Sequence, residues 1–276
     1  MRPLAVLVIV TAVWGVTFVQ VKDAVALYPL FAFLAVRFLI ASGTLAVPGA
    51  RRVSTLGRPG LGAALVAGAL LASGYALQTA GLERTSVSAT GFITGMQTVL
   101  TPLLAFSLFR LRARRAVWVG IALSTIGLAL LAGVHGGSPV GDLLVLGGAA
   151  AYALQIVLLE RFAPRYDPVA FTLVEMLVAC AGLGAIAIAR GELAWPLGWT
   201  VWGALLVTGV FASALAFLAQ TWAQRRTTAS RTALAFSLEP VWAAVFGYSL
   251  AGDRLGLSGW LGCAVIMSGI VVAETR

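Results

Sequence analysis

Three ionisable residues lie deep inside long apolar stretches of the sequence: Arg37, Glu175 and Glu239. Arg37 is the central residue of FLAVRFLIA (33–41). In a helix it would lie about 14 Å from the start of its apolar run, which is near the middle of a bilayer. A charged side chain at that depth is costly, so it normally faces a bundle interior or a wet cavity and has a partner. These residues are therefore the first candidates for a functional site.

The sequence leaves three roles open for Arg37. It would brace the fold by pairing with Glu175 or Glu239, hold a substrate carboxylate with its guanidinium fork, or extend toward lipid headgroups. Its depth disfavours the last role. One base and two acids leave a net charge of −1 if all three are ionised. We therefore expect one acid to be protonated or balanced by a cationic substrate group, which makes protons candidate coupling ions.

Further polar and aromatic residues inside the apolar stretches extend this set to a candidate substrate cavity. Each amide among them has a structural alternative, which is an interhelical hydrogen bond. The candidate cavity residues are Trp14, Gln20, Arg37, Gln78, Gln97, Tyr152, Gln155, Glu175, Gln220, Glu239 and Trp242. Lys22, at the outer end of the first apolar stretch, is a candidate gate residue, with extension toward the interface as its alternative.

The composition shows what must position these residues. The chain has 276 residues, of which 60% are hydrophobic and 11% charged, and its mean hydropathy is +0.97. A soluble domain this apolar could not cover its core, whereas apolar runs of about 18 to 23 residues suit membrane-spanning helices. The sequence predicts an all-α multi-pass membrane protein with ten spans, at 4–22, 28–47, 60–82, 88–109, 117–134, 142–162, 168–189, 200–224, 230–251 and 257–273.

The basic residues predict the orientation of these spans. Fourteen of the 19 lysines and arginines lie near the termini or the even-numbered connections. Only Lys22, Arg84, Arg190 and Arg254 lie near the odd-numbered connections, and Arg37 is the remaining one. Because basic residues concentrate on the cytoplasmic side, both termini are predicted to be cytoplasmic, in the plasma (inner) membrane. The same asymmetry explains most of the net charge of +9, so no nucleic-acid partner is needed.

The two halves of the chain resemble each other. A shift of 142 residues aligns, without a gap, Gln78 with Gln220, Arg84 with Arg226, Gly120 with Gly262 and Gly127 with Gly269. A shift of 138 places Arg37 over Glu175. Because each half holds five spans, an odd number, the second half would enter the membrane inverted. We therefore predict two inverted five-helix repeats, residues 1–135 and 136–276, an arrangement typical of secondary transporters.

Four segments carry a resemblance to a known family: AVWGVTFVQVKDAV (12–25), ATGFITGMQTVLTPLL (89–104), LEPVWAAVFGYSLAGDRL (238–255) and GWLGCAVIMSGIVVA (259–273). In order and spacing they resemble the EamA-type members of the drug/metabolite transporter superfamily. The resemblance implies transport of small solutes, often the export of amino acids, metabolites or drugs. The chain departs from the family in RLRARR (110–115), where an acidic residue is common.

We therefore expect a secondary transporter that moves a small organic solute by alternating access, and we expect export rather than import. The alternatives are a passive channel or a membrane scaffold or sensor without transport. An embedded enzyme is disfavoured, because the single histidine, His135, lies in a connection and no GxSxG or HExxH motif occurs. The two cysteines, Cys180 and Cys263, lie inside spans and show no metal-binding spacing. No metal or other cofactor is expected, and the oligomeric state is left open.

Overall fold

The computed structural model describes residues 3–85, 87–132, 138–196, 198–250 and 256–274. Within these ranges the side chains of residues 18–20, 22–23, 87–88 and 274 are not described. The described chain is all-helical and contains no strand. Its elements are α1 (Pro3–Val25), α2 (Leu30–Gly49), η1 (Ala50–Leu56), α3 (Gly57–Leu82), α4 (Val87–Gly95), α5 (Gln97–Phe109), α6 (Arg115–Ala132), α7 (Pro139–Phe162), η2 (Ala163–Arg165), α8 (Pro168–Ala189), α9 (Trp199–Val207), η3 (Thr208–Leu215), α10 (Ala216–Gln224), α11 (Ala229–Phe236), α12 (Glu239–Leu250) and α13 (Leu257–Glu274).

Each predicted span coincides with one helix or with a run of consecutive helices. The span predicted at 168–189 matches α8 at both ends. Among the described residues, seven apolar segments are long enough to cross a membrane, and the segment Leu30–Leu82 contains two predicted spans joined by η1. Shorter apolar segments lie at Pro3–Thr17 and Leu257–Ala273. The all-helical membrane class is therefore supported, whereas the crossing of all ten spans and their inverted pairing stay predictions.

Two predicted spans are broken near their middle. One divides into α4 and α5 at Met96, and another divides into α11 and α12 at Ser237 and Leu238. Met96 and Leu238 differ by the same 142 positions that align the two halves. The second break precedes Pro240, whose ring fixes φ and removes a donor, so it is tolerated in the first turn of α12.

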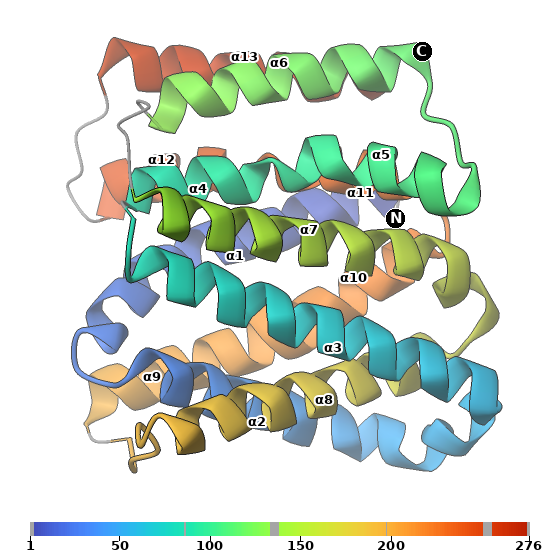
Figure 1. Ribbon diagram of the computed structural model, residues 1–276, viewed down its shortest axis with the longest axis vertical. Coiled ribbons are helices and arrows are strands. Elements are labelled where there is room, and N and C mark those ends of the chain that lie inside the picture. Colours follow the sequence, from blue (N-terminus) through green and yellow to red (C-terminus); the bar gives the residue numbers. More distant parts are fainter. Residues whose placement is uncertain (1–2, 86, 133–137, 197, 251–255, 275–276) are drawn as a thin grey trace.

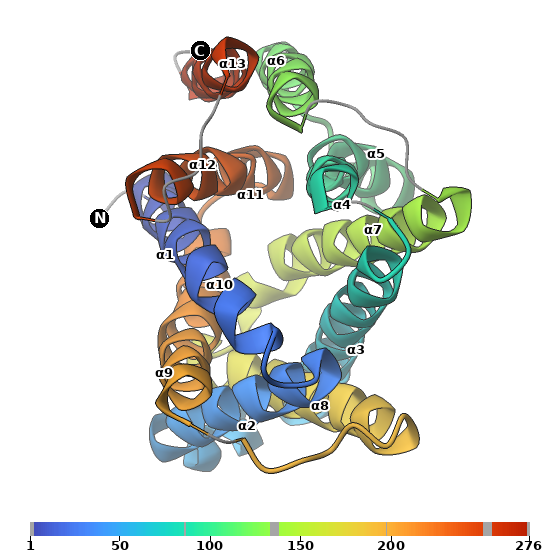
Figure 2. The same ribbon diagram turned by 90° about the vertical axis from the view of Figure 1, so that its left-hand side faces the viewer.

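The helices run side by side in one bundle (Figure 1), with the start of α1 and the end of α13 at the same end of it. Seen from one end of the bundle (Figure 2), α6 and α13 form an outer pair beyond α5 and α12. The largest buried cluster includes Phe38 and Leu45 of α2, Leu71 of α3, and Met176 and Leu183 of α8. Packing between these helices fixes the position of Arg37 within the bundle.

Glycines allow α6 and α13 to approach closely. A Cβ atom on Gly127 would lie 2.6 Å from the carbonyl oxygen of Gly262, and one on Gly120 would lie 2.5 Å from that of Gly269. The reverse substitutions meet the same obstacle, because Cβ atoms on Gly262 and Gly269 would lie 2.6 Å from the Gly127 and Gly120 oxygens. Membrane helices commonly pack through small residues at such crossings, because lipid provides no hydrophobic driving force for their association.

The glycine contact gives a first prediction. Gly127→Ala should destabilise the protein by about 1–3 kcal/mol, since the backbone of α13 cannot yield to the added methyl group. Gly43→Ala is the matched control, because no atom beyond its chain neighbours and its own helix backbone lies within 4 Å of its Cβ position. That control should be neutral or stabilising by up to about 1 kcal/mol through helix propensity. Thermal unfolding of both variants in detergent measures the difference, and equal melting temperatures would contradict the close approach.

Candidate functional site

Arg37 lies on α2 and is only 8% exposed. Its Nε donates a hydrogen bond to Ser213 Oγ at 2.6 Å, and its Nη2 donates to the Ala212 carbonyl at 3.4 Å. No ion pair joins Arg37 to either Glu175 or Glu239, although the structure describes all three side chains. The acid partner expected from the sequence is therefore not found. Arg37 instead braces α2 against the segment that carries Ala212 and Ser213.

That segment is η3, a π-helix in the middle of a predicted span. The wider π turn disturbs the regular ladder of backbone hydrogen bonds, and such turns often occur at functional sites. Here the Ala212 carbonyl also accepts a hydrogen bond from Trp14 Nε1 at 2.7 Å. The close approach of α2 depends on Gly209, where a Cβ would lie 2.7 Å from Ile40 Cγ2. Two candidate residues, Trp14 and Arg37, therefore meet at η3.

Aromatic rings surround the guanidinium of Arg37. Its Cζ lies 5.6 Å from the ring centroid of Tyr75 and 5.8 Å from that of Phe38, distances at which cation–π attraction operates. Tyr75 contacts Tyr152 edge-on, with ring centroids 5.6 Å apart. The Tyr152 hydroxyl donates a hydrogen bond to Gln78 Oε1 at 3.0 Å. The structure thus joins candidates Arg37, Tyr152 and Gln78 through Tyr75.

Tyr75 is a residue that the sequence interpretation missed. It precedes Gln78 by three positions, so the two share a face of α3, and this spacing could have identified it. Gly74 beside it is required by packing, because a Cβ there would lie 2.4 Å from Tyr152 Cε1. Nearby, Trp14 packs against Phe217 and Phe236 with centroids 5.5 and 4.9 Å away.

Glu239 completes this group. It is the first residue of α12 and is partly buried. Arg37, Tyr75 and Tyr152 lie within electrostatic range of its carboxyl group. We call Arg37, Tyr75, Tyr152 and Glu239 the central cluster. It offers one cation, one acid and two aromatic rings from four helices.

A second group of candidates forms a separate buried network. Gln155 Nε2 donates to Glu175 Oε1 at 3.0 Å, and Gln220 Nε2 donates to Gln155 Oε1 at 3.1 Å. Gln220 also donates to Gln224 Oε1 at 3.0 Å, and Gln224 donates to the Ile156 carbonyl at 2.8 Å. We call Gln155, Glu175, Gln220 and Gln224 the amide network. The sequence predicted the first three, and Gln224 was missed.

Four further candidates belong to neither group. Gln97 is 9% exposed at the start of α5. Trp242 stacks on Phe246 at 6.0 Å, and α1 approaches it so closely that a Cβ on Gly15 would lie 2.4 Å from Trp242 Cβ. The side chains of Gln20 and Lys22 lie outside the described part of the structure. The predicted repeat boundary between residues 135 and 136 also lies outside it, within 133–137.

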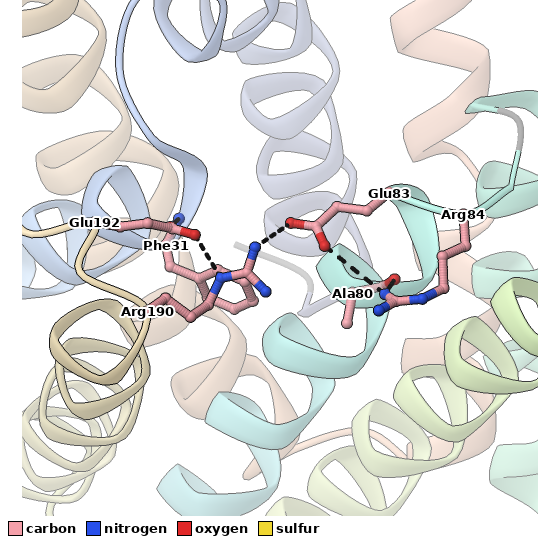
Figure 3. Close-up of polar contacts among 6 residues, drawn as sticks. All are labelled: Phe31, Ala80, Glu83, Arg84, Arg190 and Glu192. Atoms are coloured by element: carbon pink, nitrogen blue, oxygen red, sulfur yellow. Dashed lines mark hydrogen bonds and ion pairs between the residues drawn. The ribbon is translucent and has the colours of Figure 1, made fainter.

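A cluster of charged residues lies where α3 and α8 end and α2 begins (Figure 3). Arg190, at the end of α8, forms ion pairs with Glu83 at 3.0 Å and with Glu192. Glu192 Oε2 accepts a hydrogen bond from the backbone N–H of Phe31 at 3.3 Å, and Arg190 Cζ lies 4.9 Å from the Phe31 ring centroid. The hydrogen bond to Glu192 raises the pKa of the Arg190 guanidinium. We call Glu83, Arg190 and Glu192 the ionic cluster.

Comparisons with known proteins agree with this architecture. A protein of known crystal structure superimposes with a TM-score of 0.85 at 21% sequence identity, covering 100% of this chain and 98% of that chain. This likeness shows the fold alone.

Relatives and a family model identify the class of protein. An "uncharacterized transporter" of Archaeoglobus fulgidus is 27% identical over 273 residues, covering 98% of this chain and 85% of the relative. The "uncharacterized inner membrane transporter" YedA of Escherichia coli (strain K12) is 29% identical over 266 residues, covering 94% and 86%. The EamA-like transporter family model matches residues 1–133 and 139–275. The resemblance stated from the sequence is thereby confirmed, and the chain belongs to the EamA-like transporter family.

Proposed function

We propose that this membrane transporter is a secondary transporter that moves a small organic solute across the plasma (inner) membrane by alternating access, with export as the main direction. The observation that carries the proposal is the central cluster. It places one cation, one acid and two aromatic rings inside an apolar bundle, on α2 and α3 from the first half and α7 and α12 from the second. Intramembrane charges of this kind typically mark a substrate or ion pathway.

The chemistry of the central cluster suggests the class of solute. Arg37 suits a carboxylate or another planar anion, and Glu239 suits an ammonium group. The rings of Tyr75 and Tyr152 suit an apolar or aromatic moiety. We therefore propose an amphipathic metabolite, amino acid or drug-like compound that carries at least one charged group.

Two observations support the inverted repeat on which alternating access would depend. The glycine contacts between α6 and α13 are reciprocal: Gly120 contacts Gly269, and Gly127 contacts Gly262. The alignment of the two halves matches Gly120 with Gly262 and Gly127 with Gly269, so it exchanges these two contacts. Two equivalent helices related by a twofold axis would make such paired contacts. In addition, the family model matches the chain twice. Inverted repeats of this kind rock around a central site in many secondary transporters.

The ionic cluster is the proposed external closure. It joins the ends of α2 and α3, in the first half, to the end of α8, in the second. If both termini are cytoplasmic, as the basic residues predict, this end of the bundle faces outward. Breaking the ionic cluster would then accompany opening to the outside.

An export experiment tests the proposed function. Cells that overproduce the protein should release particular amphipathic solutes faster than matched cells that produce Arg37→Gln at the same membrane level. Mass spectrometry of the growth medium measures the difference. A passive channel would instead release many small solutes without selection, and a scaffold or sensor would leave the medium unchanged.

A further inference from the structure

The amide network surrounds an acid that the central cluster does not use. Glu175 is 0% exposed and lies eight residues into α8, so it is about 10 Å from the start of that helix. Its Oε1 accepts the hydrogen bond from Gln155, whereas its Oε2 has no hydrogen-bond partner among the described residues. A buried carboxyl oxygen without a donor is unusual enough to require an explanation.

The network lacks a donor at a second place. Gln220 Oε1 is also buried without a hydrogen-bond partner, while both bonds of its Nε2 point away to Gln155 and Gln224. Two acceptors in one connected network are therefore unsatisfied, and both are oxygens. Oxygens in this position accept a hydrogen bond from an O–H or N–H group, or they coordinate a small cation.

Among the described residues, no positive charge is paired with Glu175. No ion pair joins Arg37 to Glu175, although both side chains are described. Other titratable or charged groups lie on α8, on α7 and on the elements packed closely against α8. They are Cys180, Arg51, Arg52, Arg58, Tyr75, Asp142, Tyr152, Glu160 and Arg161. The neighbouring α10 and η3 carry none. Of these described groups, none is hydrogen bonded or ion paired to Glu175. An unpaired buried carboxylate costs several kcal/mol, whereas a neutral carboxylic acid avoids that cost.

The amide network leads toward one surface. Gln224 is the last residue of α10 and is followed by Arg225, in a connection that the basic residues predict to be cytoplasmic. One turn away, the Thr172 hydroxyl donates to Thr221 Oγ1 at 3.0 Å and joins α8 to α10 directly. Glu175 thus lies between the centre of the bundle and the predicted cytoplasmic surface.

We propose that Glu175 binds one exchangeable proton and that this proton couples solute movement to the proton gradient, the coupling resting on the proposed transport function. In the described conformation the carboxyl is neutral and carries the proton. On release, its O–H bond breaks, the proton passes to cytoplasmic water, and the carboxylate stays on Glu175. The amide network stabilises that carboxylate through Gln155, so the site serves both states.

Infrared spectroscopy tests the proton without any solute. Purified protein in liposomes at neutral pH should show the C=O stretch of a protonated carboxyl, and Glu175→Gln should remove one such band. Glu239→Gln is the matched control and should keep the Glu175 band. Should Glu175→Gln fail to fold, Glu175→Asp should shift the band instead of removing it. Superimposable spectra of the wild type and a folded Glu175→Gln variant would overturn the proposal.

Sodium is the competing ligand, and the same measurement separates it. The band should be identical in sodium chloride and choline chloride. Loss of the band in sodium chloride alone would assign the oxygens to Na⁺ and overturn the proton site.

Coupling is tested with a solute found by the export experiment. A gradient of one pH unit across proteoliposomes should support about tenfold accumulation at one proton per solute. Glu175→Gln should lose this accumulation and keep solute exchange, because the neutral amide resembles the protonated acid. Unchanged accumulation would overturn the coupling. If the infrared band is present while no solute moves, the transport function and the coupling fail and the proton site stands.

Discussion

Arg37→Gln is expected to lower solute transport about tenfold or more and to destabilise the protein by about 1.5–3 kcal/mol. The guanidinium bridges Ser213 and Ala212 of η3 and lies against the Tyr75 ring. A glutamine is shorter and neutral, so it can neither reach both acceptors nor attract the ring. Transport in proteoliposomes and thermal unfolding in detergent measure the two losses.

Two further variants separate the brace from a substrate contact. Ser213→Ala removes the shorter hydrogen bond and keeps the charge, the Ala212 bond and the Tyr75 contact, so a brace alone would make it reproduce part of the loss of Arg37→Gln in both assays. Arg37→Lys keeps the charge without the guanidinium fork. If Arg37 also holds the solute, Arg37→Lys should raise the KM for transport well beyond the effect of Ser213→Ala. A wild-type melting temperature for Arg37→Gln would contradict the brace.

Arg190→Glu is expected to open the external end of the bundle. The substitution would place three carboxylates together where the arginine now pairs with Glu83 and Glu192. Each half-exposed pair is worth only about 0.2–1 kcal/mol, but juxtaposed like charges cost several kcal/mol. A cysteine at Gln78, with Cys180 and Cys263 replaced by alanine, should therefore react about tenfold faster with an impermeant thiol reagent added outside intact cells.

Two controls accompany this measurement. Arg84→Glu is the matched variant, because the Arg84 guanidinium bonds to the Ala80 carbonyl of α3 and pairs with the neighbouring Glu83, not with Glu192 or Arg190. It should leave the labelling rate near that of the parent. The double reversal Glu83→Arg with Arg190→Glu should slow labelling again. Labelling that is insensitive to all of these changes would mean that the ionic cluster does not close the bundle.

Helix positions were predictable because apolar run length is a property of the sequence alone. The boundaries of α8 were predicted at both ends, and the segment between 200 and 224 was predicted to be helical. The π-helix η3 inside that segment was not, because apolar periodicity does not distinguish α from π turns. The break at Met96 was missed for a similar reason. Near Ser237 the sequence did give a signal, because Pro240 removes a backbone donor inside its span and indicates a broken or kinked helix there.

The partner of Arg37 could not be predicted because it depends on how α2 is rotated and placed against distant helices. Aligned positions in two repeats, such as Arg37 and Glu175, need not face each other. The central cluster was partly predicted, since burial cost singles out Arg37 and Glu239. Tyr75 carries no such cost and was missed. The ionic cluster was missed because Glu83 and Arg190 are 107 positions apart.

The transport claim is tested most directly by letting purified protein select its own solute. Proteoliposomes are incubated in a total metabolite extract of bacterial cells, washed, and their contents measured by mass spectrometry. We expect a small set of amphipathic, charged solutes to be enriched by the wild type and not by Arg37→Gln or protein-free liposomes. Identical contents in all three preparations would contradict transport by this chain, and equal enrichment by Arg37→Gln would contradict the central cluster as its site.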